Sequence, residues 1–312
     1  MPHDHLQRQT ECPHRATFFP FGHALLVESN DPRALAIARS TFGFWPMPAK
    51  PGPAVRVRLL LDPAVSTAPP WPAATYRGTG NVIALACGGS FAFTDLEGRY
   101  GQAHFSEAQV RDPEHFRWTF LYALTSYPLH HSFYTPVHCS CVVKGGRGYC
   151  LNGPSGAGKT SLAYHCGRHG FDVVAEDIVF ADRTGTPVLR GSAHVFNLTA
   201  DSARLFPELV QYQVTLARNG KDCLVVPAQD QGIRWVPECA PGGVVLLDRG
   251  GPIGLHQLPP EEVVDRLYGE LQVDSPEIMN LQRQTYERLA ACGAYRLGYS
   301  TLDEGLELLK QL

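Results

Sequence analysis

The sequence has no excess of charge and very little lysine. Its 312 residues include 27 Lys or Arg and 30 Asp or Glu, which gives a formal net charge of -3 at pH 7. Proteins that bind nucleic acid or an anionic membrane surface usually carry a basic excess, so we expect neither as a partner. Lysine occurs only at positions 50, 144, 159, 221 and 310. Any lysine near a candidate site is therefore easy to test by substitution.

Long apolar runs and a disulfide framework are also missing. The chain has no apolar stretch of about 18 residues, and its first residues, MPHDHLQRQTECPH, lack the apolar core of a signal peptide. The nine cysteines are odd in number and follow no framework spacing, as expected of reduced thiols in the cytoplasm. Cys139, Cys141 and Cys150 lie near several histidines, but no second C-x-x-C pair completes a zinc site. We interpret them as buried cysteines of a β-hairpin.

The first half of the chain is predicted to form a smaller α+β domain over residues 1–133. Short strands are expected at 24–28, which is apolar, and at 55–61, where apolar and polar residues alternate. Helices are expected to begin at Asp31 and at Asp112, each an N-cap residue followed by proline. This half carries no recognisable chemical motif.

The second half, 134–312, is predicted to form an α/β domain. The apolar stretch 173–180 is expected to be one buried strand, and 242–248 has the composition of a central strand. Thr301 and Glu304 have the spacing of a capping box, which predicts a terminal helix. With 44% hydrophobic and 18% charged residues, the chain has the composition of an ordinary globular protein.

A glycine-rich loop, LNGPSGAGKTS at 151–161, stands out in this half. It fits G-x-x-x-x-G-K-[ST], follows a predicted strand and precedes a predicted helix, which is the context that a phosphate-binding loop requires. The glycines allow positive φ, so that backbone N–H groups can turn inward around phosphate oxygens. Lys159 would reach the β- and γ-phosphates of ATP, and the Thr160 hydroxyl would ligate Mg²⁺. The expected nucleotide-binding residues are Gly153, Pro154, Ser155, Gly156, Ala157, Gly158, Lys159, Thr160 and Ser161.

Phosphoryl transfer also needs Mg²⁺ ligands and a carboxylate that accepts a proton from the acceptor. Glu176 and Asp177 follow the apolar residues 173–175, at the end of a strand, where open α/β sheets assemble their sites. Adjacent acids face opposite sides of a regular strand, but a turn at its end lets both reach one site. The alternative is a solvent-facing turn capped by two acids; beside a phosphate-binding loop we favour a functional pair.

The arrangement resembles the HPr kinase/phosphorylase family and its relatives, the HPr-kinase-like peptide kinases of lasso-peptide pathways. The resemblance covers about 134–200 well and the rest of the second half loosely. His138 stands just before the strand pair that leads to the loop, as in that family. The family's V-A-D-D-like segment is matched by 174–177, and the second half of its E-I-R-G-like segment by Arg190 and Gly191. The ending AYRLGYSTLDEGLELL is similar to the closing strand and helix of the peptide kinases.

The resemblance implies a P-loop kinase domain of the HPr-kinase C-terminal type. By role, it implies that Glu176 accepts the proton of a substrate hydroxyl, that of a serine, and that Asp177 and Thr160 hold Mg²⁺. His138 would orient the acidic pair, Arg190 would neutralise charge on the γ-phosphate, and Lys221 would close over the nucleotide. A core histidine, a surface arginine and an ordinary turn lysine are the alternatives for these last three.

The departures from the family point away from HPr as the substrate. A glutamate, Glu176, replaces the family's first aspartate, and Val188 stands where the bifunctional enzymes have a metal-associated glutamate. The second departure puts phosphorolysis in doubt. Residues 1–133 do not resemble the N-terminal half of the HPr enzymes either, and we expect them to recognise the acceptor.

Three functions stay open at this stage. The first is a kinase that phosphorylates a peptide or small protein, in a peptide natural-product pathway. The second is a kinase of a small hydroxylated metabolite, which the same site could serve. The third is a nucleotide-binding sensor, which the acidic pair argues against because a sensor needs no general base. The sequence leaves the oligomeric state open, a homo-oligomer included.

Overall fold

The computed structural model describes residues 10–183, 187–216, 222–270 and 275–312. These residues form a mixed α/β structure with sheets of seven, nine and three strands. The chain divides into two compact units, Met1–Phe133 and Tyr134–Leu312. Within the described ranges, no helix combines the length and the apolar character needed to cross a membrane.

The N-terminal unit is built on the seven-stranded sheet, in the order β1-β2-β3-β7-β6-β5-β4. β3 pairs in parallel with β2 and β7, and the other neighbours are antiparallel. The alternation of HALLVES in β2 buries every second side chain, as expected of a half-buried strand. The strands are β1 (His14–Phe18), β2 (His23–Ser29), β3 (Gly52–Leu61), β4 (Thr75–Thr79), β5 (Val82–Cys87), β6 (Ser90–Asp95) and β7 (Tyr100–Phe105).

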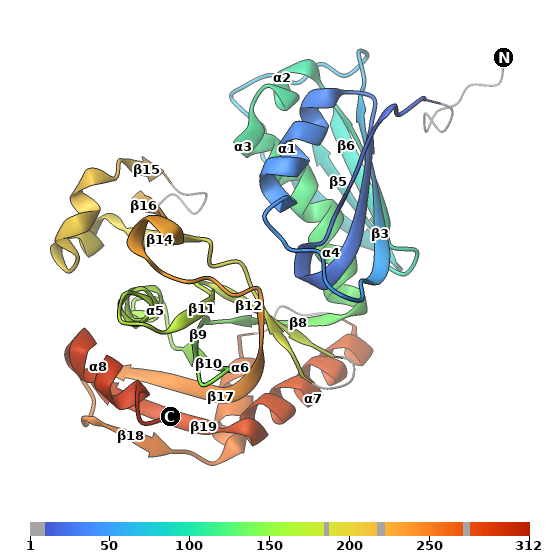
Figure 1. The fold of residues 1–312 in the computed structure, drawn as a ribbon. Helices are drawn as coiled ribbons and strands as arrows, with labels where there is room; N and C mark the ends of the chain where they lie inside the picture. The colour runs from blue at the N-terminus through green and yellow to red at the C-terminus, as the bar shows by residue number, and fades with distance from the viewer. Residues whose placement is uncertain (1–9, 184–186, 217–221, 271–274) are drawn as a thin grey trace. The chain divides into compact units, whose positions relative to one another are not determined.

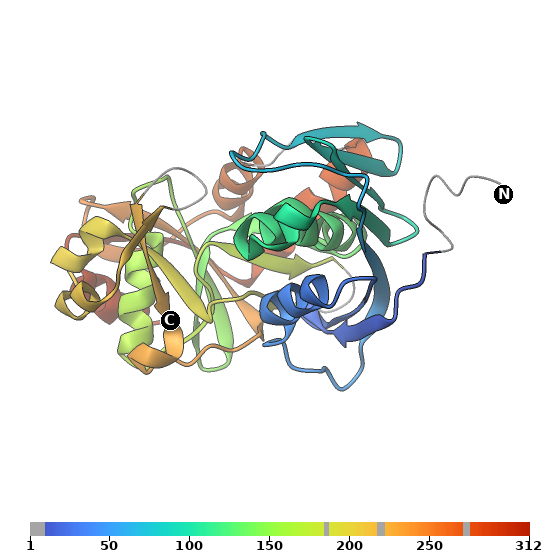
Figure 2. The same cartoon turned by 90° about the horizontal axis from the view of Figure 1, so that it is seen from above.

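Helices cover one face of this sheet. The two longest, α1 (Pro32–Phe42) and α4 (Tyr122–Ser132), lie on the same face in Figures 1 and 2, with the Phe42 and Tyr122 rings 6.1 Å apart. The short helices α2 (Glu107–Val110) and α3 (Pro113–Phe116) and a π-helical turn, Arg117–Leu121, lead into α4. Asp31 and Asp112 cap α1 and α3 through side-chain bonds to backbone N–H groups, so both predicted helix starts are confirmed.

The C-terminal unit holds the nine-stranded sheet, in the order β11-β9-β10-β17-β13-β12-β8, with β19 beside β17 and β18 beside β19. The central strands β10, β17 and β19 are parallel, so their carboxyl ends lie at one edge. The strands of this sheet are β8 (Tyr134–His138), β9 (Ser140–Lys144), β10 (Arg147–Asn152), β11 (Asp172–Ala175), β12 (Ile178–Asp182), β13 (Leu189–Arg190), β17 (Glu238–Arg249), β18 (Gly254–Gln257) and β19 (Ala294–Tyr299).

Two apolar layers enclose this sheet (Figure 1). On one face, α5 (Lys159–Arg168) and α8 (Leu302–Leu309) form a core with the small sheet of β14 (Val195–Thr199), β16 (Asp222–Pro227) and β15 (Val214–Leu216). On the other face lie α6 (Pro260–Tyr268) and α7 (Pro276–Cys292). Three 3-10 turns, Ala200–Arg204, Pro207–Gln211 and Ala228–Gln231, complete the described elements of this unit, and a fourth, Pro20–Gly22, precedes β2 in the N-terminal unit. Thr301 and Glu304 form the expected capping box of α8.

The expectation of one strand over 173–180 is wrong. The chain breaks at Glu176 and Asp177, so that β11 pairs with β9 whereas β12 pairs with β8 and β13. Both stretches are apolar because the side chains of both are buried in the core of this unit, and an apolar run alone does not reveal the turn between them. Residues 188–196 likewise do not form one strand: they contribute to β13 and β14, which belong to different sheets.

Candidate active site

The glycine-rich loop connects β10 to α5 and folds around its own lysine. Gly156 and Gly158 have φ angles of 87° and 92°, a region that L side chains rarely adopt. The Lys159 side chain is buried, and its Nζ donates to the Gly153 carbonyl at 2.8 Å and to the Pro154 carbonyl at 3.4 Å. Because these carbonyls are uncharged, they do not neutralise the Lys159 ammonium, which can therefore pair with an anion.

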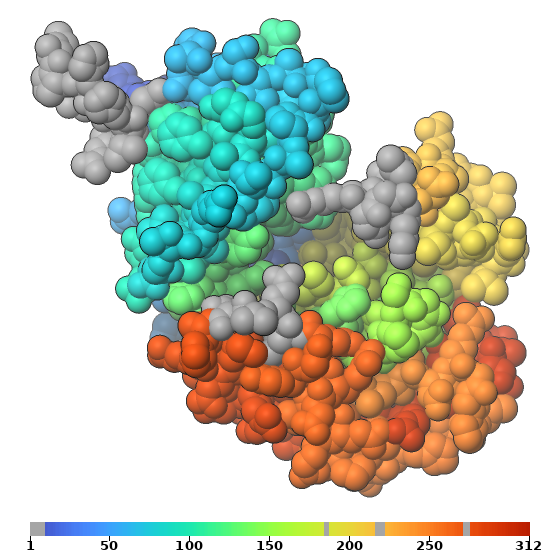
Figure 3. Space-filling model, turned by 180° about the vertical axis from the view of Figure 1, so that it is seen from behind, coloured from blue at the N-terminus to red at the C-terminus, as the bar shows by residue number. Residues whose placement is uncertain are grey.

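The back of the loop is fixed by the end of β19. The hydroxyl of buried Tyr299 donates to the Ala157 carbonyl at 3.0 Å. A Cβ added at Gly153 would lie 2.9 Å from the Cβ of Ala157, so a side chain there would push the loop open. The tip, 154–156, is exposed, and the lime-coloured middle of the chain reaches the surface of this unit in Figure 3. The loop is therefore shaped in advance and open to a ligand from solvent.

The break between β11 and β12 brings the acidic pair to this loop. Ser140 of β9 donates to the Glu176 carbonyl and holds the turn against the sheet. Asn197 of β14 donates from Nδ2 to Glu176 Oε1 at 2.8 Å. Burial raises the pKa of Glu176 to about 7, while hydrogen bonds from Asn197 and Thr160 limit the rise. A carboxyl with this pKa exchanges protons at neutral pH.

Asp177 has the opposite shift. Its Oδ1 lies 3.2 Å from His138 Nε2, and this contact, followed by the charges of His138 and Lys159, lowers the pKa of Asp177 below its usual value. His138 is itself held through its carbonyl, which accepts from Asn152 Nδ2 at 3.0 Å, at the end of the strand that carries the loop. Asp177 therefore stays ionised at neutral pH, as a metal ligand must.

The same residues suit Mg²⁺. Among the described residues, no three His, Cys, Asp or Glu side chains are close enough to form a metal cage made of protein alone. Mg²⁺ bound together with nucleotide phosphates needs only one or two protein ligands. The Thr160 hydroxyl and the Asp177 carboxylate are oxygen donors of this kind.

The structure thus places five of the expected site residues together: Lys159, Thr160, Glu176, Asp177 and His138. Arg190 lies apart from them, on β13. Its guanidinium pairs with Asp182 at 3.1 Å and with Glu238 at 3.0 Å and faces the Tyr134 ring. With two carboxylates already bound, Arg190 is poorly placed to serve a γ-phosphate, and its role stays a prediction that this geometry does not favour. Lys221 lies outside the described residues.

Two polar residues at this site were missed by sequence reasoning. Asn197 contacts Glu176 but comes from the small three-stranded sheet, and no local pattern marks it. Arg249 ends β17, and its Nη1 lies 3.9 Å from where a Cβ of Gly158 would stand. The apolar run 242–248 did mark a central strand, so the residue just past its end could have been considered.

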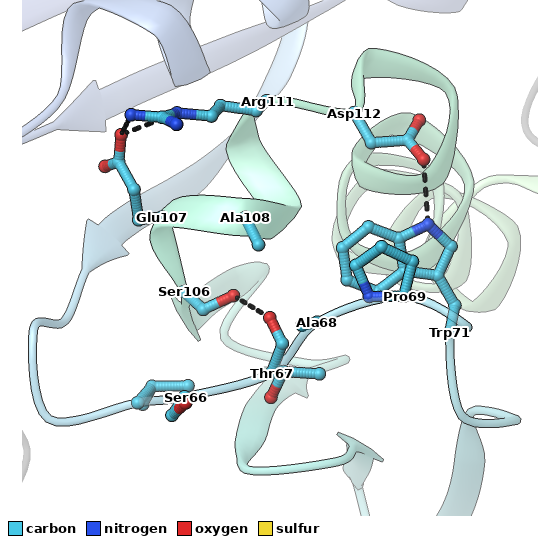
Figure 4. Close-up of a pocket in the computed structure, with 11 residues that line it drawn as sticks. Ser66, Thr67, Ala68, Pro69, Trp71, Ser106, Glu107, Ala108, Arg111 and Asp112 are labelled. Atoms are coloured by element: carbon cyan, nitrogen blue, oxygen red, sulfur yellow. Dashed lines mark hydrogen bonds and ion pairs between the residues drawn. The ribbon is translucent and has the colours of Figure 1, made fainter.

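A hollow of about 490 Å³ lies in the N-terminal unit, between residues 65–71 and α2 (Figure 4). Its polar groups already bind one another. The Trp71 indole donates to Asp112 at 2.8 Å, the Ser106 hydroxyl donates to the Thr67 carbonyl at 2.8 Å, and Glu107 pairs with Arg111 at 2.9 Å. We therefore assign no chemistry to this hollow.

Comparisons with known proteins add little to this picture. No family model and no curated protein matches the chain. One solved structure to which it is similar is the Hpr(Ser) kinase/phosphatase from Coxiella burnetii, at 10% identity over 56% of this chain and 94% of the other, with a TM-score of 0.29. A similarity at this score does not establish a shared function, so the proposed function rests on the residues of the site.

Proposed function

We propose that the protein is an ATP- and Mg²⁺-dependent phosphotransferase that transfers the γ-phosphate to a hydroxyl group, that of a serine in a peptide or small protein. One observation carries the proposal: Lys159 and Thr160 of the loop lie beside two carboxyls whose pKa values are shifted in opposite directions. Pairs of titratable groups separated in this way are typical of sites that divide acid–base work from charge stabilisation.

Each residue has a distinct part in the proposed reaction. The loop N–H groups and Lys159 bind the β- and γ-phosphates. Thr160 and Asp177 would hold Mg²⁺, which when bound draws negative charge from the phosphates. Glu176 takes the proton of the acceptor hydroxyl while the hydroxyl oxygen forms a bond to the γ-phosphorus. The bond between that phosphorus and the leaving oxygen of ADP breaks. Asn197 orients the Glu176 carboxylate.

The exposure of the acidic side favours a large acceptor over a small one. The side chains of Asp177 and His138 are 60% and 50% exposed. A small metabolite is usually enclosed by its pocket, whereas a serine on a flexible chain can enter an open surface. A kinase of a hydroxylated metabolite and a sensor without an acceptor are the competing outcomes of the test. We also propose that the N-terminal unit recognises the acceptor.

The test offers γ-labelled ATP and Mg²⁺ to the purified protein together with extract of its own organism, and the labelled products are then sized. The variant Asp177→Asn removes the negative charge at almost constant shape. Asp201→Asn makes the same change at a side chain that is 83% exposed and serves as the control.

Label on a peptide or protein with wild type and Asp201→Asn, lost with Asp177→Asn, is the expected result. Label on a small molecule would replace the peptide by a metabolite acceptor. Release of label only as free phosphate, or ATP binding without any transfer, would reject the kinase and leave the sensor.

A further inference from the structure

A hollow of about 400 Å³ lies at the last turn of α5, beside the residues that end β17 and precede α8. One end is formed by Arg249, where β17 ends, and by Ser300, just before α8. The other end is formed by the last turn of α5 and by the turn that carries Phe206. Its volume falls within the range of about 300 to 1,000 Å³ that is typical of small-molecule sites.

The hollow reaches Arg249, a residue close to the phosphate-binding loop. The Nη1 of this residue lies 3.9 Å from the position of a Gly158 Cβ. Tyr299, which directly precedes Ser300, bonds to the carbonyl of Ala157. Arg249 therefore lies between the loop and the hollow, where it could contact a ligand that extends from one to the other.

The chemistry of the walls suits an aromatic, largely uncharged group. Leu205, Phe206 and Leu302 provide apolar surface, and the His165 ring lies 6.2 Å from the Phe206 ring. Two of the polar groups are already paired, His165 with Asp303 at 2.8 Å and Arg168 with Glu208. The Arg249 side chain makes no hydrogen bond or ion pair with the described residues and is exposed. Apolar side chains close to an exposed cation are typical of a site for a base and its adjacent phosphate.

The sheet order fixes which way a nucleotide would lie. β10, which carries the loop, stands between β9 and β17. The acidic pair is anchored on the β9 side through Ser140, and Arg249 and Ser300 lie on the side of β17 and β19. In-line transfer places the acceptor and the leaving nucleotide on opposite sides of the γ-phosphorus. The nucleoside must then extend toward β17 and β19, where the hollow lies.

We propose that this hollow receives the base and ribose of the nucleotide and that Arg249 binds its α-phosphate. The inference rests on the proposed function, since it presumes a nucleotide in the loop. It adds a site for the nucleoside of ATP, which the residues of the phosphate-binding motif do not contact.

Calorimetric titration with Mg-ATP and with Mg-tripolyphosphate separates the two parts of the ligand. Tripolyphosphate carries the phosphates without a nucleoside, so we expect wild type to bind ATP roughly tenfold more tightly. Ser300→Phe places a ring in the hollow at an exposed position. It should reduce ATP affinity to that of tripolyphosphate and leave tripolyphosphate binding, which also reports an intact fold, unchanged.

Arg249→Gln should weaken both ligands roughly tenfold, because a charge-assisted hydrogen bond to the α-phosphate is lost. Arg147→Gln makes the same change at the opposite end of β10, where the side chain is exposed, and should weaken neither.

Unchanged ATP affinity in Ser300→Phe, or equal losses for both ligands, would overturn the nucleoside site and leave the phosphotransferase standing. Unchanged affinity in Arg249→Gln would overturn the assignment of Arg249. Failure of wild type to bind either ligand would instead reject the proposed function itself.

Discussion

Replacing Glu176 with glutamine should stabilise the protein at neutral pH while it removes the proposed base. Burial raises the pKa of Glu176 from its usual 4.5 to about 7, so the unfolded chain releases this proton at a lower pH than the folded protein does. The stability due to Glu176 is therefore fully present below pH 4.5 and is lost as the pH rises through 7. Glutamine cannot ionise and should not show this loss.

The size of the effect follows from the pKa difference. At about 1.4 kcal/mol per pH unit, the interval from 4.5 to 7 corresponds to roughly 3 kcal/mol. The Glu176 side chain is partly exposed, and solvent screens part of the interaction. We expect wild type to lose about 2 kcal/mol of unfolding free energy relative to Glu176→Gln between pH 4.5 and pH 8.

Urea unfolding of both proteins at these two pH values measures the difference. Other groups that titrate in this range, such as buried histidines, are common to both proteins and cancel when the two pH dependences are subtracted. Glu287→Gln is the control, because its side chain is 54% exposed and, among the residues that the structure describes, pairs only with Arg283 on the same helix. The same preparations should show a loss of transfer rate of roughly 10² to 10⁴ in Glu176→Gln alone.

Parallel pH dependences for wild type and Glu176→Gln would refute the reasoning. They would mean that Glu176 titrates in the folded protein as it does in the unfolded chain, and that its pKa is not raised by the surroundings described above. A variant that keeps its transfer rate would separately remove Glu176 from the chemistry, whatever its stability.

Three further outcomes are expected. Lys159→Met should weaken ATP binding about a hundredfold in calorimetry without altering the circular dichroism spectrum, because it removes the buried cation of the loop. Gly158→Ala should lower the unfolding free energy by more than Gly156→Ala does. Both glycines have positive φ, where alanine costs roughly 1 to 2 kcal/mol. A Cβ at Gly158 would in addition lie 3.1 Å from the Tyr299 hydroxyl, whereas a Cβ at Gly156 would have no atom of a described, non-adjacent residue within 4 Å. Asn197→Ala should move the acid limb of the kcat/KM profile about one pH unit upward, because the hydrogen bond from Asn197 favours ionised Glu176; an unmoved limb would separate Asn197 from Glu176.

The parts of the site that the sequence could predict are those encoded locally. The loop between β10 and α5 is recognisable because its glycines, lysine and threonine must keep a fixed spacing to wrap a phosphate. The helix starts at Asp31, Asp112 and Thr301 are local in the same sense, since a capping side chain bonds to N–H groups two or three residues away.

What the sequence could not give depends on pairing between distant strands. Arg190 has the spacing of a catalytic residue, yet Glu238, which holds it, is far away in sequence and is brought close only by the pairing of β13 with β17. Asn197 reaches Glu176 because β14 leaves the main sheet and joins a second one. Neither fact has a local signature, since strand partners are chosen by the fold as a whole.

The break at Glu176 and Asp177 depends both on the local sequence and on pairing between distant strands. Had 173–180 been one strand, the adjacent acids would have faced opposite sides of the sheet. The two carboxyls could then not both have reached the loop, and they could not have shared one site. Because the chain turns there, Glu176 lies against Asn197 and Thr160 while Asp177 meets His138 in solvent. Two neighbouring acids thereby acquire opposite pKa shifts from their surroundings alone. The turn, rather than the acids themselves, is what would let one carboxyl accept a proton while the other keeps its charge.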